Sequence, residues 1–219
     1  MNICKKYKIG FVAIPKTACS SIKHLFFELE NGFNFQIFRA NGKDYNVHTI
    51  YPSRYFKKGY RVSDYDDYFR FLIVRDPVKR FLSSYSNRVI YYKNLAPWTL
   101  SKEARDAGAT PNPDLIGYVE RLELYRAHSG HIRHHTDSVH TFTGKDLSWF
   151  DEVYPIEEMG RCAADLSRVC GQPITIPHEQ SGGPKFQLSD LPPEHLAKVI
   201  DFYAEDYALL SKFYSPPKI

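Results

Sequence analysis

The sequence predicts an α/β fold with three layers, in which helices cover a short, mainly parallel sheet. Two stretches support this prediction: "IGFVAIPKTACSSIKHLFFEL" and "FRFLIVRDPVKRFLSSY" each place a continuous apolar run before a polar loop and a helix. Continuous apolar runs are typical of parallel strands that are buried on both faces. The length of 219 residues suits one core, so we expect residues 1–219 to form a single domain.

The composition is that of a globular protein without a membrane span. Hydrophobic residues make up 43% of the chain and charged residues 25%, and no run approaches the roughly 18 apolar residues of a transmembrane helix. The net charge of +4 suits an anionic ligand, but it is too small to predict nucleic-acid binding. The four cysteines lack metal-ligand spacing and are too few for a disulfide scaffold, so we expect free thiols and no metal site.

The first half of the chain opens with a strand, a loop and a helix. We expect the strand at residues 7–14 and the helix from Ser20 to Asn31, because apolar residues recur there at helical spacing. The apolar run ends in Pro-Lys rather than a small-residue cleavage site, which favours a strand over a signal peptide. A further strand is expected at residues 33–38. A polar, aromatic-rich connection over residues 46–56 follows it and carries His48.

The second strand-loop-helix unit combines a strand at Phe69–Val74 with a helix that begins at Pro77, a residue suited to a first helical turn. The composition of residues 93–113 is typical of a loop. Beyond it the pattern predicts, in order, a helix over 113–128, a histidine-rich loop, a short strand leading into a helix that ends near Gly171, and an amphipathic helix over 193–213.

The loop of the first unit predicts an anion site, because a helix N-terminus offers unpaired N–H groups and the positive end of the helix dipole. The pattern of a kinase P-loop is nearly met from Gly10 to Thr17, but Pro15 replaces the second glycine and supplies no N–H. The donors are therefore expected after Lys16, which adds a positive charge. They are the N–H groups of Thr17, Ala18, Cys19 and Ser20 and the hydroxyls of Thr17, Ser20 and Ser21.

The loop of the second unit predicts another anion site. Asp76 ends the strand as a metal-binding aspartate would, but Arg75 precedes it and Pro77 follows, which favours an anion over Mg²⁺. The alternative is that Arg75 pairs with Asp66 or Asp67 on the surface. Two anion sites on neighbouring strand ends predict a ligand that is phosphorylated at both ends.

Together, "PKTACSS" and "RDPVKRFLSSY" resemble the 5′-phosphosulfate loop and the 3′-phosphate motif of sulfotransferases that use 3′-phosphoadenosine 5′-phosphosulfate (PAPS). The chain most resembles the carbohydrate branch, similar to sulfotransferase family 2, and weaker similarity extends to "HHTDSVHTF", "DEVYPIEEM" and "PHEQSGGPKF". The resemblance implies a P-loop-like sulfotransferase fold that needs no metal. It implies that Lys16 and Thr17 to Ser21 bind the 5′ end of the nucleotide, and that Arg75 and Ser83 bind its 3′ phosphate.

The acceptor hydroxyl must lose a proton, and His48 is our candidate base because it lies where carbohydrate members carry a catalytic histidine. The alternative is an ordinary loop histidine. His134 and His135 are candidates for base or substrate contact, against a solvated loop. Arg80 is a candidate substrate contact, against a scaffold ion pair. Ser181 and Lys185 are candidates to close over the nucleotide, against a flexible turn.

The sequence therefore predicts transfer of a sulfuryl group from PAPS to a hydroxyl of an acceptor, a carbohydrate or glycolipid. Two alternatives stay open: a small-molecule kinase that uses ATP and Mg²⁺, and a non-catalytic protein that binds a nucleotide or polysaccharide. The oligomeric state is not predicted. Because many members of the family are membrane-anchored and this sequence shows no anchor, we expect a cytoplasmic enzyme of bacterial type.

Overall fold

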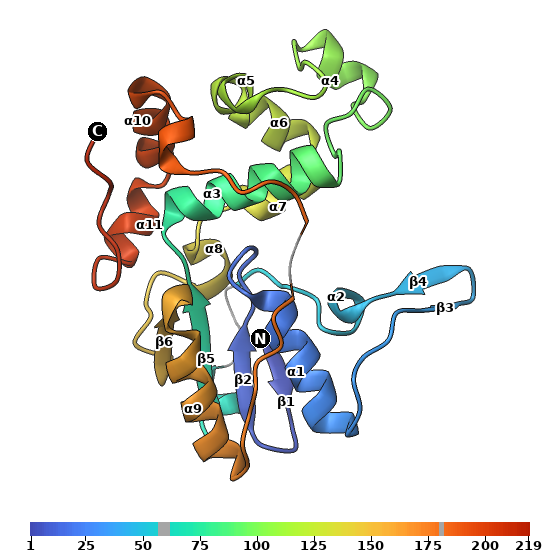
Figure 1. Ribbon diagram of the computed structural model, residues 1–219, viewed down its shortest axis with the longest axis vertical. Coiled ribbons are helices and arrows are strands. Elements are labelled where there is room, and N and C mark those ends of the chain that lie inside the picture. The colour runs from blue at the N-terminus through green and yellow to red at the C-terminus, as the bar shows by residue number, and fades with distance from the viewer. Residues whose placement is uncertain (57–61, 180–181) are drawn as a thin grey trace. The chain divides into compact units, whose positions relative to one another are not determined.

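A computed structural model describes residues 1–56, 62–179 and 182–219 (Figure 1). The chain divides into two compact units, each built from two segments. Unit 1 comprises Met1–Arg75 and Val139–Glu179, and unit 2 comprises Asp76–Ser138 and Gln180–Ile219. Among the described residues, no helix is both long enough and apolar enough to cross a bilayer. All four cysteines are free thiols in the structure.

Unit 1 contains a sheet, a hairpin and several helices. Its strands are β1 (Asn2–Cys4), β2 (Ile9–Val12), β3 (Phe38–Ala40), β4 (Lys43–Tyr45), β5 (Phe69–Val74) and β6 (Glu152–Pro155). Its helices are α1 (Cys19–Asn31), α2 (Val47–Ile50), α8 (His140–Thr143) and α9 (Met159–Cys170), with 3₁₀ turns η1 (Val62–Tyr65) and η3 (Ile156–Glu158).

The sheet has the strand order β1-β2-β5-β6, and two of its three pairings are parallel. Ile9 of β2 is opposite Phe69 of β5, and Phe71 of β5 is opposite Glu152 of β6. All four residues of β2 are buried, as the continuous apolar run predicts. The α/β class is therefore confirmed, with a mixed sheet. The antiparallel strand β1 was not expected, because its three residues are too few to form a pattern.

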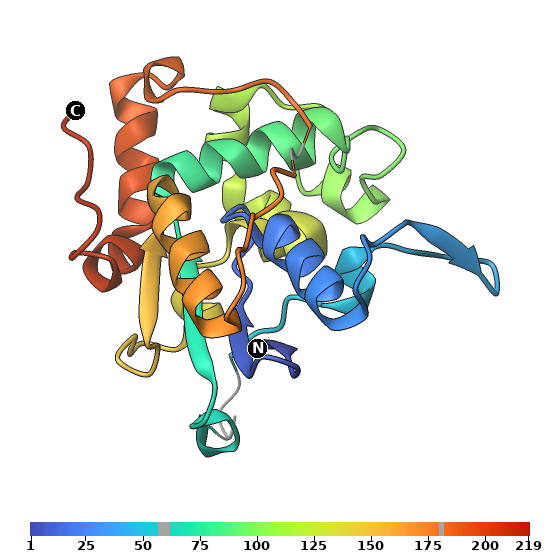
Figure 2. The same ribbon diagram turned by 60° about the horizontal axis from the view of Figure 1, so that its bottom comes forward.

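Helices α1 and α9 pack on the same face of this sheet (Figure 2). Phe26 of α1 and Cys162 of α9 share one apolar cluster with Phe11 and Phe71, which are inward-facing residues of β2 and β5. The rings of Phe11 and Phe71 lie 5.1 Å apart between centroids. Because alternate strand residues point to opposite faces, Phe11 points toward the two helices. This packing holds β2 in place close to its end, where the first loop begins.

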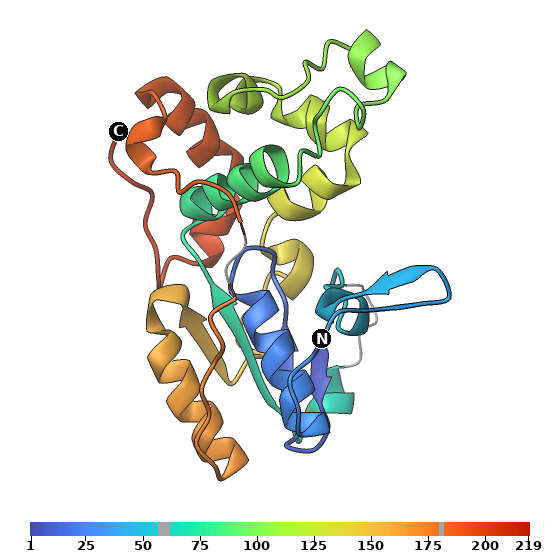
Figure 3. The same ribbon diagram turned by 45° about the vertical axis from the view of Figure 1, so that its right-hand side comes forward.

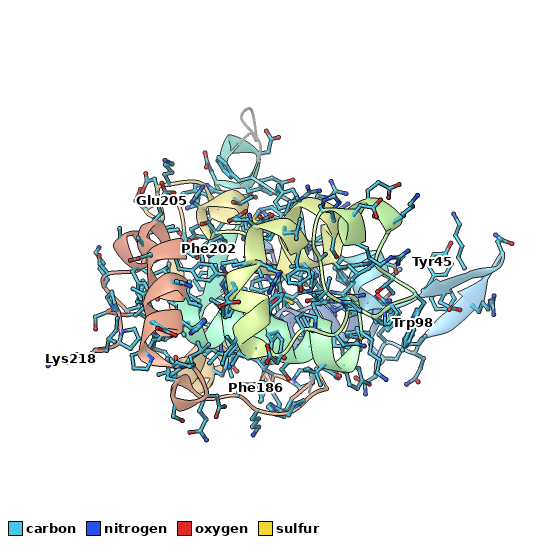
Figure 4. All side chains as sticks on the ribbon, turned by 90° about the horizontal axis from the view of Figure 1, so that it is seen from above. Tyr45, Trp98, Phe186, Phe202, Glu205 and Lys218 are labelled. Atoms are coloured by element: carbon cyan, nitrogen blue, oxygen red, sulfur yellow. The ribbon has the colours of Figure 1, made fainter. Side chains whose placement is uncertain are left out.

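The segment after α1 differs from the expected strand at residues 33–38. Only Phe38 of that segment lies in a strand, and β3 and β4 form an antiparallel hairpin that projects beyond α2 (Figure 3). Its turn contains Asn41 and Gly42, both with positive φ (51° and 73°), which suits a tight hairpin turn. Tyr45, labelled in Figure 4, stacks on Phe38 with 4.9 Å between ring centroids. The prediction of a strand at residues 33–38 was wrong because Phe38 starts a strand at its end and pairs with Tyr45 across the hairpin turn.

Unit 2 is helical. It contains α3 (Pro77–Tyr85), α4 (Lys102–Asp106), α5 (Leu115–Glu120), α6 (Leu122–His128), α7 (Gly130–Thr136), α10 (Pro193–Phe202) and α11 (Ala204–Leu209). A π-helical turn, η2 (Ser86–Tyr91), continues α3, and a 3₁₀ turn, η4 (Leu188–Asp190), precedes α10. Pro77 occupies the first turn of α3, as predicted, and the Asp76 side chain caps the helix by accepting from Lys79 N at 2.9 Å.

The prediction of a histidine-rich loop in unit 2 was wrong, because residues 130–136 form helix α7. Ser129 caps this helix: its hydroxyl accepts from the N–H of Ile132 at 3.3 Å. Ile132 and Thr136 are buried one turn apart. Ile132 is the only apolar side chain of this segment, so the sequence shows no apolar repeat from which a helix could be predicted. The two long helices expected at 113–128 and 193–213 are each broken in two, at Arg121 and at Tyr203.

Candidate functional site

The loop between β2 and α1 has a backbone shape suited to an anion. Lys16 (φ 70°) and Ala18 (φ 56°, ψ 22°) are both left-handed, and Thr17 lies between them. Alternation of right- and left-handed residues turns successive N–H groups toward one concave side, where they can bind an anion. The loop leads directly into α1 at Cys19, so the helix N-terminus contributes its own unpaired N–H groups.

Two of the hydroxyls expected in this loop are engaged elsewhere. The fully buried Thr17 hydroxyl donates to the Ile14 carbonyl at 2.9 Å, which holds the loop in shape. The buried Ser21 hydroxyl accepts from the N–H of Glu179 at 3.3 Å. The proton of the Thr17 hydroxyl is therefore used within the loop, whereas the Ser21 hydroxyl accepts in this contact and keeps its own proton to donate.

Arg75 lies beside the same loop. Its guanidinium donates from Nη1 to the Lys16 carbonyl at 3.4 Å. The two carboxylates that could have paired with Arg75 are bound by other residues: Asp66 lies 3.6 Å from Arg70, and Asp67 lies 2.6 Å from Lys8. Arg75 therefore contacts the backbone of the loop at Lys16, which brings its guanidinium to the candidate anion site of unit 1.

His48 lies in helix α2 and not in an irregular loop. The Asn46 side chain caps this helix by accepting from the N–H groups of His48 (2.9 Å) and Thr49 (3.2 Å). The cap fixes the position of the imidazole, whose Nε2 lies 3.0 Å from the Ser20 hydroxyl. The candidate base and the helix that follows the anion loop are therefore linked directly.

Lys23 is a member of this cluster that the sequence analysis missed. Its amine lies 3.1 Å from His48 Nδ1 and donates to the Ser53 hydroxyl at 2.9 Å. The side chain is fully buried on α1, and burial lowers the pKa of the amine below its ordinary value of 10.5, with a small opposing effect from Cys19. A lysine in this setting can lose its proton more readily than a lysine in water.

A signal for Lys23 was present in the sequence but ambiguous. Lys23 follows Ser20 by three positions, which places both on one face of a helix. It also interrupts the apolar stripe at Ile22, Leu25 and Phe26, and a lysine beside such a stripe is typically solvent-exposed. Only the packing of α2 against α1 determines that this lysine is buried.

The remaining candidates lie in unit 2. Ser83 is half-buried on α3. Arg80, one turn before it, is fully buried and donates from Nη2 to the Asp137 carbonyl at 2.8 Å and to the Asp206 carboxylate at 3.2 Å. Its guanidinium also lies over the ring of Tyr203, 5.1 Å from the centroid. This is the scaffold ion pair that the sequence left as the alternative, so Arg80 has no substrate role in what we propose below.

The histidines of α7 are also held within unit 2. His135 Nε2 accepts from Arg88 Nε at 3.0 Å, and its Nδ1 lies 2.9 Å from the His131 carbonyl. His134 packs against His135 with 5.3 Å between ring centroids. These contacts anchor η2 to α7, because Arg88 belongs to η2.

Ser181 lies outside the described residues, whereas Lys185 is exposed. The turn before Lys185 packs closely on η2: the Ser86 hydroxyl donates to the Pro184 carbonyl at 2.5 Å. A Cβ on Gly183, which has φ 111°, would lie 2.5 Å from the Ser86 hydroxyl oxygen. The glycine therefore permits this close approach.

The cluster in unit 1 thus consists of the β2–α1 loop, Arg75, Ser20, His48 and Lys23. Within the described ranges, no group of three or more His, Cys, Asp or Glu residues could hold a metal ion. The cluster is cationic and rich in N–H donors, and it includes an imidazole with a hydroxyl at one nitrogen and an amine at the other.

The family model described as "Sulfotransferase family" matches this chain over residues 1–214. Searches of curated proteins and of solved structures gave no significant match. The family match covers both strand-loop-helix units and extends through α11. The protein therefore belongs to the sulfotransferase family, whose enzymes transfer a sulfuryl group to an acceptor.

Proposed function

We propose that this protein transfers the sulfuryl group of PAPS to a hydroxyl of a carbohydrate acceptor. The observation that carries the proposal is the β2–α1 loop, in which left-handed Lys16 and Ala18 precede the N-terminus of α1 and the Arg75 guanidinium lies beside Lys16. A positively charged concave loop of this kind suits the 5′ end of PAPS, which supplies the sulfuryl group.

Each residue has a distinct role in this proposal. The N–H groups of Thr17 to Ser20 bind the 5′ phosphate, and Lys16 stabilises the negative charge that develops as the sulfur–oxygen bond breaks. Arg75 binds the 3′ phosphate. His48 accepts the proton of the attacking hydroxyl. Sulfuryl transfer resembles phosphoryl transfer in that positioning and charge stabilisation provide most of the catalysis.

The kinase alternative has less support. Pro15 supplies no N–H at the position where a P-loop glycine would. The acidic residue at the second strand end, Asp76, is engaged within its own unit: one oxygen caps α3, and the other accepts from the Tyr207 hydroxyl at 3.2 Å. The carbohydrate acceptor follows from resemblance to the carbohydrate branch and depends less on the cluster itself.

A thermal-shift measurement tests the nucleotide. A ligand that binds only the folded protein stabilises it by about 2.7 kcal/mol at a hundredfold excess over its dissociation constant. We expect 3′-phosphoadenosine 5′-phosphate to raise the melting temperature and AMP to raise it much less, because AMP lacks the 3′ phosphate. Equal shifts with both nucleotides, or a shift only with ATP and Mg²⁺, would contradict the proposal.

The role of His48 is tested by the variant His48→Ala, with His24→Ala as the matched control. His24 lies on α1 beside Lys23 and packs against Phe35 with 5.8 Å between ring centroids. Loss of a general base lowers kcat by about 10²- to 10⁴-fold, so we expect such a loss for His48→Ala with nucleotide binding retained. We expect His24→Ala to keep the wild-type rate. Unchanged transfer by His48→Ala would remove His48 from the mechanism.

A further inference from the structure

The contact between Lys23 and His48 has two proton arrangements with different consequences. A charged lysine has three donors and no acceptor, so it can only donate to His48 Nδ1. The imidazole then carries its own proton on Nε2, where it donates to the Ser20 hydroxyl 3.0 Å away. In this arrangement Nε2 has no lone pair to offer and cannot act as a base.

An uncharged lysine amine reverses the arrangement. It still donates to the Ser53 hydroxyl, 2.9 Å away, and its lone pair accepts from Nδ1–H of His48 across the 3.1 Å contact. The Nε2 atom is then unprotonated and can accept from a hydroxyl. The protonation state of one buried amine thus selects the tautomer of the neighbouring imidazole.

The surroundings of Lys23 favour the uncharged form. The side chain is fully buried, and its hydrogen-bond partners among the described residues are His48 and Ser53, so no carboxylate neutralises its charge. Among the described residues, the titratable groups that act on it are Cys19, on its own helix, and His48 on α2. Desolvation of an ammonium without a carboxylate partner disfavours the charged form.

We propose that Lys23 positions His48 for catalysis by accepting a hydrogen bond from Nδ1–H with an uncharged amine, which leaves Nε2 unprotonated so that it can act as the base. This inference rests on the proposed function, because it assigns His48 the role of base. As the acceptor oxygen bonds to sulfur and the bond from sulfur to the phosphate oxygen breaks, the acceptor proton moves to Nε2. The imidazolium keeps its Nδ1 proton bonded to Lys23 and returns the other proton to water, since His48 is exposed. Lys23 never receives a proton from the substrate and is a positioning residue.

Nitrogen-15 NMR of histidine-labelled protein tests the tautomer without any assay of transfer. The His48 signals are assigned by their loss in His48→Gln. In the wild-type protein we expect a neutral His48 to carry its proton on Nε2 while Lys23 is charged and on Nδ1 once Lys23 has lost its proton, with His24 as the internal control that does not follow this change. A wild-type His48 that keeps Nε2–H throughout the pH range of activity would overturn the proposal, even if the protein proves to be an active sulfotransferase.

Two variants separate the tautomer from simple packing. Lys23→Gln can accept from Nδ1–H through its amide oxygen and does not titrate, so we expect Nδ1–H at every pH at which His48 is neutral. Its kcat should lose the dependence on pH that deprotonation of Lys23 gives the wild type. Lys23→Arg always donates, so it should hold His48 as Nε2–H and lower kcat about a hundredfold with little change in nucleotide affinity. A Lys23→Arg enzyme with the wild-type rate and pH profile would refute the proposal, and if this variant fails to fold, the wild-type NMR titration decides.

Discussion

Two fully buried cations, Lys23 in unit 1 and Arg80 in unit 2, show how differently this protein treats a buried charge. Arg80 is paired with the Asp206 carboxylate at 3.2 Å and lies over the ring of Tyr203. Lys23 is paired with an imidazole and a hydroxyl. An arginine cannot lose its proton in a protein, so its burial requires a compensating charge, whereas a buried lysine can become neutral. Arg80 therefore has a structural role, and Lys23 can take the chemical role that we propose for it.

Removing the carboxylate in unit 2 should give the largest effect. Asp206→Ala leaves the Arg80 charge buried without its partner, which typically costs 3–5 kcal/mol, so we expect a loss of about 4 kcal/mol in the free energy of unfolding. Urea denaturation of the variant measures it. The control is Asp201→Ala, since Asp201 is exposed on α10 and its loss should change stability by less than about 0.5 kcal/mol. Equal losses in the free energy of unfolding for the two variants would mean that the buried Arg80–Asp206 pair does not contribute to stability.

Lys23 of unit 1 should make the free energy of unfolding depend on pH, because its pKa differs between the folded and unfolded chain. The unfolded chain holds the Lys23 proton up to the ordinary pKa of 10.5, whereas the folded chain releases it at lower pH because burial lowers that pKa. Between these two pKa values unfolding takes up a proton, so the contribution of Lys23 to the free energy of unfolding rises with pH. Below the lowered pKa the contribution stays constant and unfavourable.

Lys23→Met removes this contribution. We expect the variant to be at least as stable as the wild type near neutral pH, because burial of Lys23 costs free energy whether the amine keeps its charge or gives up its proton, and an apolar side chain of similar length avoids that cost. Its advantage should shrink as the pH rises. Denaturation at a series of pH values measures the difference, and Lys198→Met, at an exposed lysine of α10, should keep the wild-type pH dependence. A constant difference between Lys23→Met and the wild type would show that Lys23 does not titrate in this range.

The sequence predicted the parts of the site that depend on local pattern. The continuous apolar run Phe69–Val74 and the proline that follows at Pro77 define β5 and the start of α3, and both are confirmed. The two loops follow from these boundaries. Local sequence pattern could not predict the different roles of Lys23 and Arg80, because the partners of a buried cation come from distant segments. Asp206 lies 126 residues from Arg80, and Ser53 lies 30 residues from Lys23.

The β2–α1 loop of unit 1 holds a second unfavourable feature, and it gives the smallest predicted effect. Ala18 is left-handed (φ 56°) at the start of α1, a conformation that costs an L-residue about 1 kcal/mol or more, while glycine adopts it without this cost. Ala18→Gly should therefore raise the free energy of unfolding by about 1 kcal/mol. Ala164→Gly is the matched control: Ala164 is exposed within α9, where glycine should instead lower stability by about 1 kcal/mol. If the two substitutions change the free energy of unfolding in opposite directions, the anion loop is conformationally strained. Unit 1 is then less stable than it could be because of the cluster that we propose to be catalytic. The same sign at both positions would mean that the loop of the free protein does not hold Ala18 in the left-handed form.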